Sequence, residues 1–90
     1  MTTNATLNPK TITDSGLPAT LETIGNLDPS HDLETLYDIS YCVGMKLRLW
    51  MYSIAQVEEK IFNKALDAGF DSSGLRDHIR IAITEGYGNK

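Results

Sequence analysis

The sequence predicts an all-α protein, a small helical bundle or hairpin built on one long helix. Large apolar residues recur at spacings of three or four from Leu36 to Ala68, which is the period of one helix face. No segment alternates apolar and polar residues over a useful length, and no hairpin dipeptide joins two β-rich runs. The 90 residues leave room for one domain only. We therefore expect a single α-helical domain over residues 14–90.

The first residues differ in composition from the rest of the chain. Residues 1–13 are rich in Thr and Asn and show no sustained apolar period, so we predict a flexible N-terminal arm. Apolar residues at helical spacing between Leu17 and Ile24, stopped by Gly25, predict a short helix over residues 17–24. A helix of about two turns is not stable alone, so this one is expected to pack on an apolar surface.

The long helix is predicted over residues 29–68. Asp28 followed by proline is a helix-start signal, because the acid can cap and proline fits the first helical position. Gly69 suits the left-handed residue after the helix, with Phe70 folding back as the hydrophobic contact. A continuous helix of this length would span about 60 Å. A break or kink near Ser40–Gly44 is therefore an open alternative.

A last helix is predicted over residues 72–85, capped by Asp71 or Ser72 and closed by Gly86. Its apolar residues fall on one face, which we expect to fold back on the long helix. These residues are Leu75, Ile79, Ala82 and Ile83.

The middle of the long helix, from Tyr41 to Tyr52, is apolar all round for about three turns. Such a segment must be buried, and a chain of this size has little material to cover it, so we predict self-association or a protein partner. The alternative is a helix broken at Gly44 whose two parts form an ordinary core. The candidate interface residues are Tyr41, Met45, Leu47, Arg48, Leu49, Trp50, Met51, Tyr52 and Ile54.

Residues 65–75 resemble the helix-turn-helix pattern, with Ala65, Gly69 four residues later, and apolar residues one and six positions beyond that glycine. A DNA-binding regulator that uses residues 65–80 is therefore the alternative function. Its electrostatics are unfavourable, because phosphate contacts need several free Lys and Arg side chains and this chain has a net charge of −4. A plain helical corner explains the same pattern. The candidate DNA contacts are Ser72, Ser73, Arg76 and Arg80.

Signals for catalysis, metals and cofactors are missing from the sequence. His31, Cys42 and His78 are not placed at metal-ligand spacing, and there is no glycine-rich phosphate loop. We therefore expect no catalytic residue, no metal and no cofactor. A weaker alternative is an oligomer that sequesters a small ligand or nucleotide in a pocket between subunits.

The single cysteine and the N-terminal residues indicate the cellular compartment. A single Cys42 cannot form an internal disulfide, and no basic and apolar signal-peptide pattern is visible, so we expect a cytoplasmic protein without a membrane span. The sequence thus predicts a non-enzymatic interaction protein, such as an adaptor, an accessory subunit or a small inhibitor of the kind mobile elements often encode. It is expected to form a homodimer or larger oligomer and to bind another protein.

Overall fold

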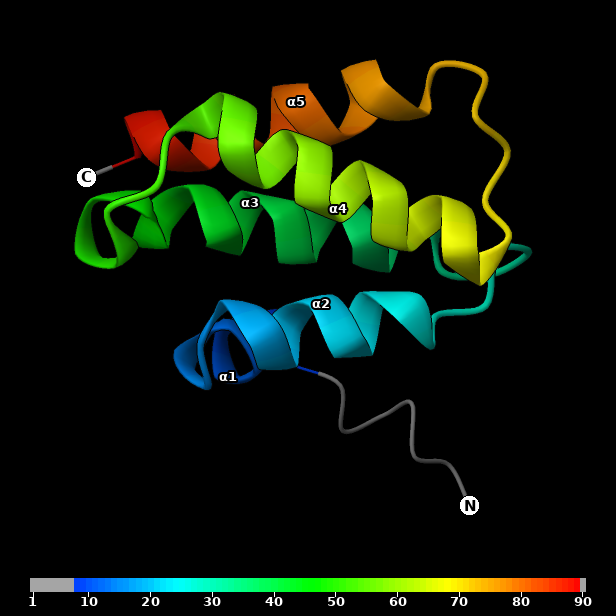
Figure 1. Cartoon of the computed structure of the whole chain (residues 1–90), viewed down its shortest axis with the longest axis horizontal. Helices are drawn as coiled ribbons and strands as arrows, with labels where there is room; N and C mark the ends of the chain where they lie inside the picture. Colours follow the sequence, from blue (N-terminus) through cyan, green and yellow to red (C-terminus); the bar gives the residue numbers. More distant parts are fainter. Residues whose placement is uncertain (1–7, 90) are drawn as a thin grey trace.

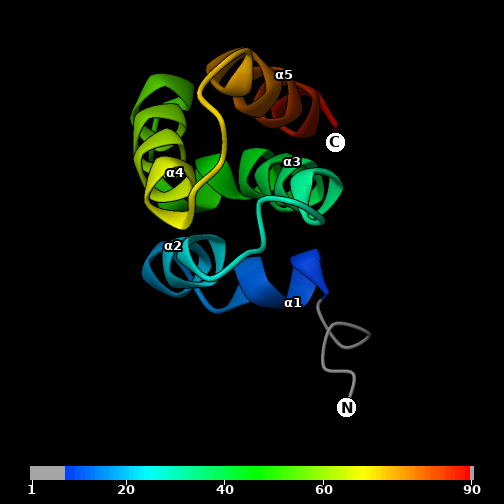
Figure 2. The same ribbon diagram turned by 90° about the vertical axis from the view of Figure 1, so that its right-hand side faces the viewer.

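The computed structural model describes residues 8–89 and confirms the all-α fold. Helix α3 lies at the centre, with α1 and α2 on one side, α5 on the opposite side and α4 alongside (Figures 1 and 2). The described part contains no β-strand and measures 34 × 28 × 20 Å. The helices are α1 (Pro9–Asp14), α2 (Leu17–Gly25), α3 (Leu33–Trp50), α4 (Ile54–Ala68) and α5 (Leu75–Gly88).

Helix α1 corrects the prediction of a flexible arm over residues 1–13, of which residues 1–7 lie outside the described part. The side chain of Asn8 caps α1 by accepting a hydrogen bond from the backbone N–H of Lys10 at 3.0 Å, and Pro9 occupies the first turn. Thr13 is buried, and its hydroxyl donates to the carbonyl oxygens of Pro9 and Lys10. The helix forms because Thr13 and the partly buried Ile12 pack inward, so tertiary contacts stabilise a segment of weak apolar period.

The start of α3 lies four residues beyond the predicted start, because Asp28 closes a separate turn. Its carboxylate accepts hydrogen bonds from the hydroxyl and the backbone N–H of Ser30, and it also contacts His31. These hydrogen bonds, led by that of the Ser30 hydroxyl, lower the pKa of Asp28 to about 2. Asp32 is the N-cap residue of α3.

The helix predicted over residues 29–68 is two helices, and the alternative of a break near Ser40–Gly44 is also wrong. Gly44 lies inside α3, whereas the chain turns at Met51, which adopts the left-handed conformation at φ 64°. Ser53 then begins α4 with a capping box. Its hydroxyl accepts from the backbone N–H of Gln56 at 3.1 Å, and the Gln56 side chain accepts from the backbone N–H of Ser53 at 2.9 Å.

We expect Ser53→Ala to lower the free energy of unfolding by about 1 kcal/mol, because the N–H of Gln56 loses its acceptor at the start of α4. Urea denaturation followed by circular dichroism measures the change. Ser72→Ala is the control, since this exposed loop serine should change stability by less than about 0.5 kcal/mol. Equal stability of the two variants would show that the capping box contributes nothing.

The end of α4 is as predicted, and the start of α5 is not. Gly69 is left-handed at φ 107°, the N–H of Phe70 donates to the carbonyl of Ala65 at 3.0 Å, and Phe70 is buried. Helix α5 begins at Leu75 and extends to Gly88 instead of covering residues 72–85. The Asp71 carboxylate does not cap α5, because it accepts from the N–H of Ser73 within the loop.

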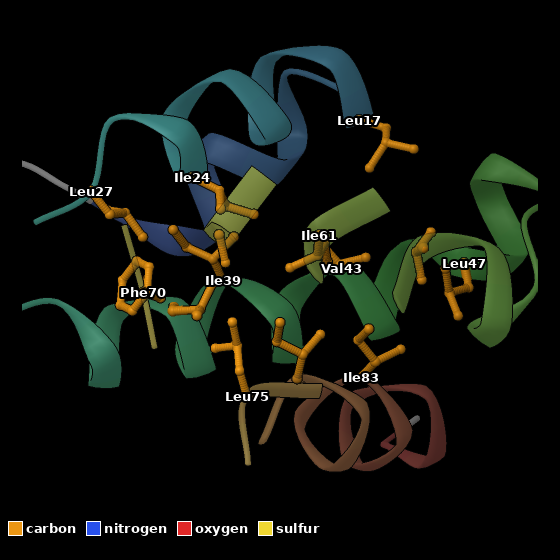
Figure 3. Close-up of a cluster of buried hydrophobic side chains, with 14 residues drawn as sticks. Leu17, Ile24, Leu27, Ile39, Val43, Leu47, Ile61, Phe70, Leu75 and Ile83 are labelled. Carbon is orange, nitrogen blue, oxygen red and sulfur yellow. The ribbon is translucent and has the colours of Figure 1, made fainter. Parts of the chain in front are cut away.

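One hydrophobic core joins all of the larger helices. Figure 3 shows Ile39, Val43 and Leu47 along α3, with Ile24 of α2 on one side and Ile83 of α5 on the other. Each of these five side chains has no exposed surface. The core therefore follows the seam predicted for the long helix, but the chain covers much of that seam itself by folding back at Met51.

Helices α3 and α5 pack against each other more extensively than any other pair, and they approach closely at two glycines. A β-carbon on Gly44 would collide with the carbonyl oxygen of Ile83, and one on Gly86 would collide with that of Tyr41. Both glycines are buried inside helices, where glycine is otherwise unfavourable. Their role is to let the two backbones touch.

Candidate functional site

Four large apolar side chains are exposed around the C-terminal end of α3. Met45 is 46% exposed, Leu49 73%, Met51 87% and Tyr52 36%. Met45 and Leu49 lie one turn apart on α3, and Met51 and Tyr52 follow directly in the turn to α4. We call these four residues the α3-end surface. Exposed apolar groups gathered in this way are typical of interaction sites.

A groove lies beside this surface, where α1 packs along α3. Its volume is about 260 Å³, and most of its lining is apolar. We call it the α1–α3 groove, and Met45 and Leu49 belong both to it and to the α3-end surface. Its lining residues are Lys10, Thr13, Cys42, Met45, Lys46 and Leu49.

The charges around the groove are balanced. Lys46 pairs with Asp14 at 2.6 Å and so ties α3 to α1, and this hydrogen bond holds the pKa of Asp14 below its usual value. Lys10 and Asp38 are the other two charged groups near Cys42. Burial raises the pKa of the Cys42 thiol, which favours its protonated form over the nucleophilic thiolate.

Three of the predicted interface residues belong to the interior instead. Leu47 is completely buried in the core, and Trp50 and Ile54 are partly buried and pack against it. A continuous helix would leave these three side chains without cover. The turn at Met51 brings α4 back and supplies that cover.

Two further predicted interface residues face α5. The amide of Asn89 donates to the hydroxyl of Tyr41 at 2.8 Å. Arg48 donates to the carbonyl of Tyr87 at 3.3 Å, and its guanidinium lies 4.1 Å from the centre of that ring. Tyr41 and Arg48 therefore hold the end of α5 on α3, away from the α1–α3 groove.

The residues predicted for DNA binding are scattered and partly neutralised. Ser72 and Ser73 are exposed in a six-residue connection, Gly69–Gly74, which is longer than the turn of three or four residues in helix-turn-helix motifs. Arg76 pairs with Glu58 at 3.1 Å and stacks on Phe62, so it fastens α5 to α4. Arg80 pairs with Asp77. These pairings disfavour a DNA interface.

Over residues 8–89, no three His, Cys, Asp or Glu side chains gather closely enough to hold a metal ion, and no helix is long and apolar enough to cross a membrane. A second hollow of about 280 Å³ lies between the turn before α3 and the loop before α5. There His78 contacts the carbonyl of Leu33 at 3.3 Å and packs on Tyr37. His78 thus has a structural role.

No family model, no curated protein and no solved structure matches the chain. The function must therefore be inferred from the α3-end surface and the α1–α3 groove.

The α1 side of the groove was missed in the sequence, although a signal for it is present. Asn8 before Pro9 is the same combination of capping residue and proline that was recognised at Asp28. Only six helical residues follow Asn8, and these are too few to show an apolar period. Lys10 and Thr13 were consequently absent from the predicted site.

Proposed function

We propose that this chain is a protein-protein interaction module that self-associates through the α3-end surface. The proposal rests on the exposure of four apolar side chains in one place on a chain whose other large apolar residues are mostly buried. These are Met45, Leu49, Met51 and Tyr52. Methionine and tyrosine are enriched at protein interfaces. A second copy would bury these side chains without any change in the fold.

The conformation of Met51 supports the proposal independently. A left-handed residue after a helix is usually glycine or asparagine, because a β-carbon is strained there. Methionine in this position costs stability, and in the monomer its 87% exposed side chain gains little in return. Contact with a second chain would bury this side chain and so offset the cost of its conformation.

Sedimentation velocity over a range of concentrations tests the proposal. We expect the wild-type chain to form dimers at micromolar concentration, and Leu49→Asp to remove them by placing a charge in the α3-end surface. Ile81→Asp is the matched control, because Ile81 is 51% exposed on α5, on the other side of α3 from α1. A wild-type chain that stays monomeric, or equal dimerisation of both variants, would overturn the proposal.

Met51→Gly should separate folding from association. We expect the dilute, monomeric protein to become more stable by about 0.5–1 kcal/mol, because glycine relieves the left-handed strain. Self-association should weaken by about tenfold, because the side chain is lost from the interface. Urea denaturation at low concentration and sedimentation at high concentration measure the two effects. A variant that associates as tightly as wild type would place Met51 outside the interface.

A further inference from the structure

The connection between α3 and α4 is short and strained. It consists of residues 51–53, and its first residue, Met51, is the one non-glycine residue within the described range 8–89 that has a positive φ. A β-carbon is unfavourable in this conformation. Short connections under strain favour the exchange of a whole segment between two copies of a chain, because the strain disappears when the connection straightens.

The apolar face of the chain runs through this connection without a change of register. Leu47 of α3 and Val57 of α4 are completely buried, and Trp50 and Ile54 between them are partly buried. These four positions are three or four residues apart, as on one face of a single helix. Residues 45–68 also contain no glycine and no proline. The sequence therefore permits α3 and α4 to form one continuous helix with a continuous apolar face.

Helices α4 and α5 can leave the rest of the chain as one unit. Arg76 of α5 pairs with Glu58 of α4 at 3.1 Å, and its guanidinium lies 4.2 Å from the centre of the Phe62 ring. This unit packs on α2 through α4 and on α3 through α5 (Figure 2). The same unit of a second copy can make each of these contacts, because the two copies are identical. Two exchanged copies therefore rebuild the core twice, and only residues 51–53 must change conformation.

We infer that the turn at Met51 is a hinge, at which α3 and α4 join into a continuous helix and the chain exchanges α4 and α5 with a second copy. The exchange releases the strain at Met51 and gives up the capping box of Ser53 and Gln56, once at each of the two hinges. The balance of these two local effects, together with the protein concentration, decides between the folded-back and the exchanged form. This inference goes beyond the proposed function, because association through the α3-end surface leaves α4 folded back on its own chain.

Two substitutions at the hinge should shift the exchange in opposite directions. Met51→Gly should lower the equilibrium constant for exchanged dimers by about a hundredfold, because glycine relaxes the turn and is unfavourable inside a continuous helix, and each dimer has two hinges. Ser53→Ala should raise this constant by about tenfold, because only the folded-back form uses the cap. Sedimentation velocity after refolding from urea at high protein concentration measures both effects. A Ser53→Ala chain that dimerises no more than wild type would overturn the hinge.

Cross-linking of thiols shows whether the α3 and α5 that touch belong to one chain. Tyr37 of α3 donates to Glu85 of α5 at 3.1 Å, so a short bis-maleimide can join Tyr37→Cys to Glu85→Cys on a Cys42→Ser background. In an exchanged dimer this link joins two chains, whereas in the folded-back form it lies within one chain. The matched control is Asp14→Cys with Lys46→Cys, because this ion pair at 2.6 Å joins α1 to α3 and stays within one chain in both forms.

The possible results separate the exchange from the proposed function. The exchange is slow in the folded protein because α4 and α5 must leave the core, so the dimers are prepared by refolding from urea at high protein concentration. Covalent dimers from the pair at positions 37 and 85, with none from the control pair, support the exchange. Sedimenting dimers that give links between chains for neither pair, or equally for both, overturn the exchange and leave the proposed function standing. A chain that stays monomeric after this refolding overturns both.

Discussion

Replacing Gly86 with alanine should lower the free energy of unfolding by about 2–3 kcal/mol, although alanine is the better helix former by about 1 kcal/mol. The reason is the crossing of α3 and α5, where a β-carbon on Gly86 would collide with the carbonyl oxygen of Tyr41. Backbone atoms cannot move aside as a flexible side chain can. The helices must separate, and the well-packed interior between them is disturbed.

The matched control lies two residues away in the same helix. Gly88 has nothing within contact distance of an added β-carbon, so Gly88→Ala should leave stability unchanged or raise it slightly. Gly44→Ala should behave like Gly86→Ala, because its β-carbon would collide with the carbonyl oxygen of Ile83. Urea denaturation gives all three values. If Gly86→Ala proved as stable as Gly88→Ala, the close crossing of the two helices would be wrong.

Leu47→Asp should unfold the protein, whereas Leu49→Asp should leave it folded, although the two substitutions place the same charge two residues apart on α3. Leu47 has no exposed surface, so aspartate there leaves a carboxylate buried without a partner and removes a core side chain. A loss of about 4–5 kcal/mol or more is expected. Since a domain of this size is stable by only about 5–10 kcal/mol, much of the protein should be unfolded.

Leu49 is 73% exposed, so Leu49→Asp should keep the fold and lose self-association. Both substitutions place a negative charge near the end of α3, so they share the unfavourable interaction with the helix dipole. The difference between their free energies of unfolding therefore measures the effect of burying the substituted side chain. Circular dichroism and urea denaturation of the two variants check this expectation, and an unfolded Leu49→Asp would contradict the assignment of Leu49 to the surface.

The sequence predicted those features that local chemistry controls. The helical period along α3 and α4 indicated which residues face the core, and glycine at position 69 followed by Phe70 indicated where α4 ends. Met45, Leu49, Met51 and Tyr52 were also among the candidate interface residues, because the segment from Tyr41 to Tyr52 is apolar all round a helix. Each of these inferences uses residues only a few positions apart.

The turn at Met51 could not be predicted in the same way. Methionine is not typical of the left-handed conformation that it adopts at position 51. Glycine is the residue that usually interrupts or ends a helix, so Gly44 was the more obvious place for a break. The capping box of Ser53 and Gln56 was available in the sequence, but it lies inside an apolar period that continues across it. A longer apolar face outweighed a short capping signal, so one helix was predicted, and the alternative break near Ser40–Gly44 lies at least seven residues before Met51.

The sequence by itself determined that the chain is all-helical and which residues of each helix are apolar, because period and capping are local properties. Only the tertiary structure decided which of these apolar residues remain exposed. That depends on where the chain turns back, and the turn at Met51 buries Leu47 while leaving Leu49 at the surface. It also depends on the close approach of α3 and α5, which gives Gly44 and Gly86 a role that no local pattern indicates.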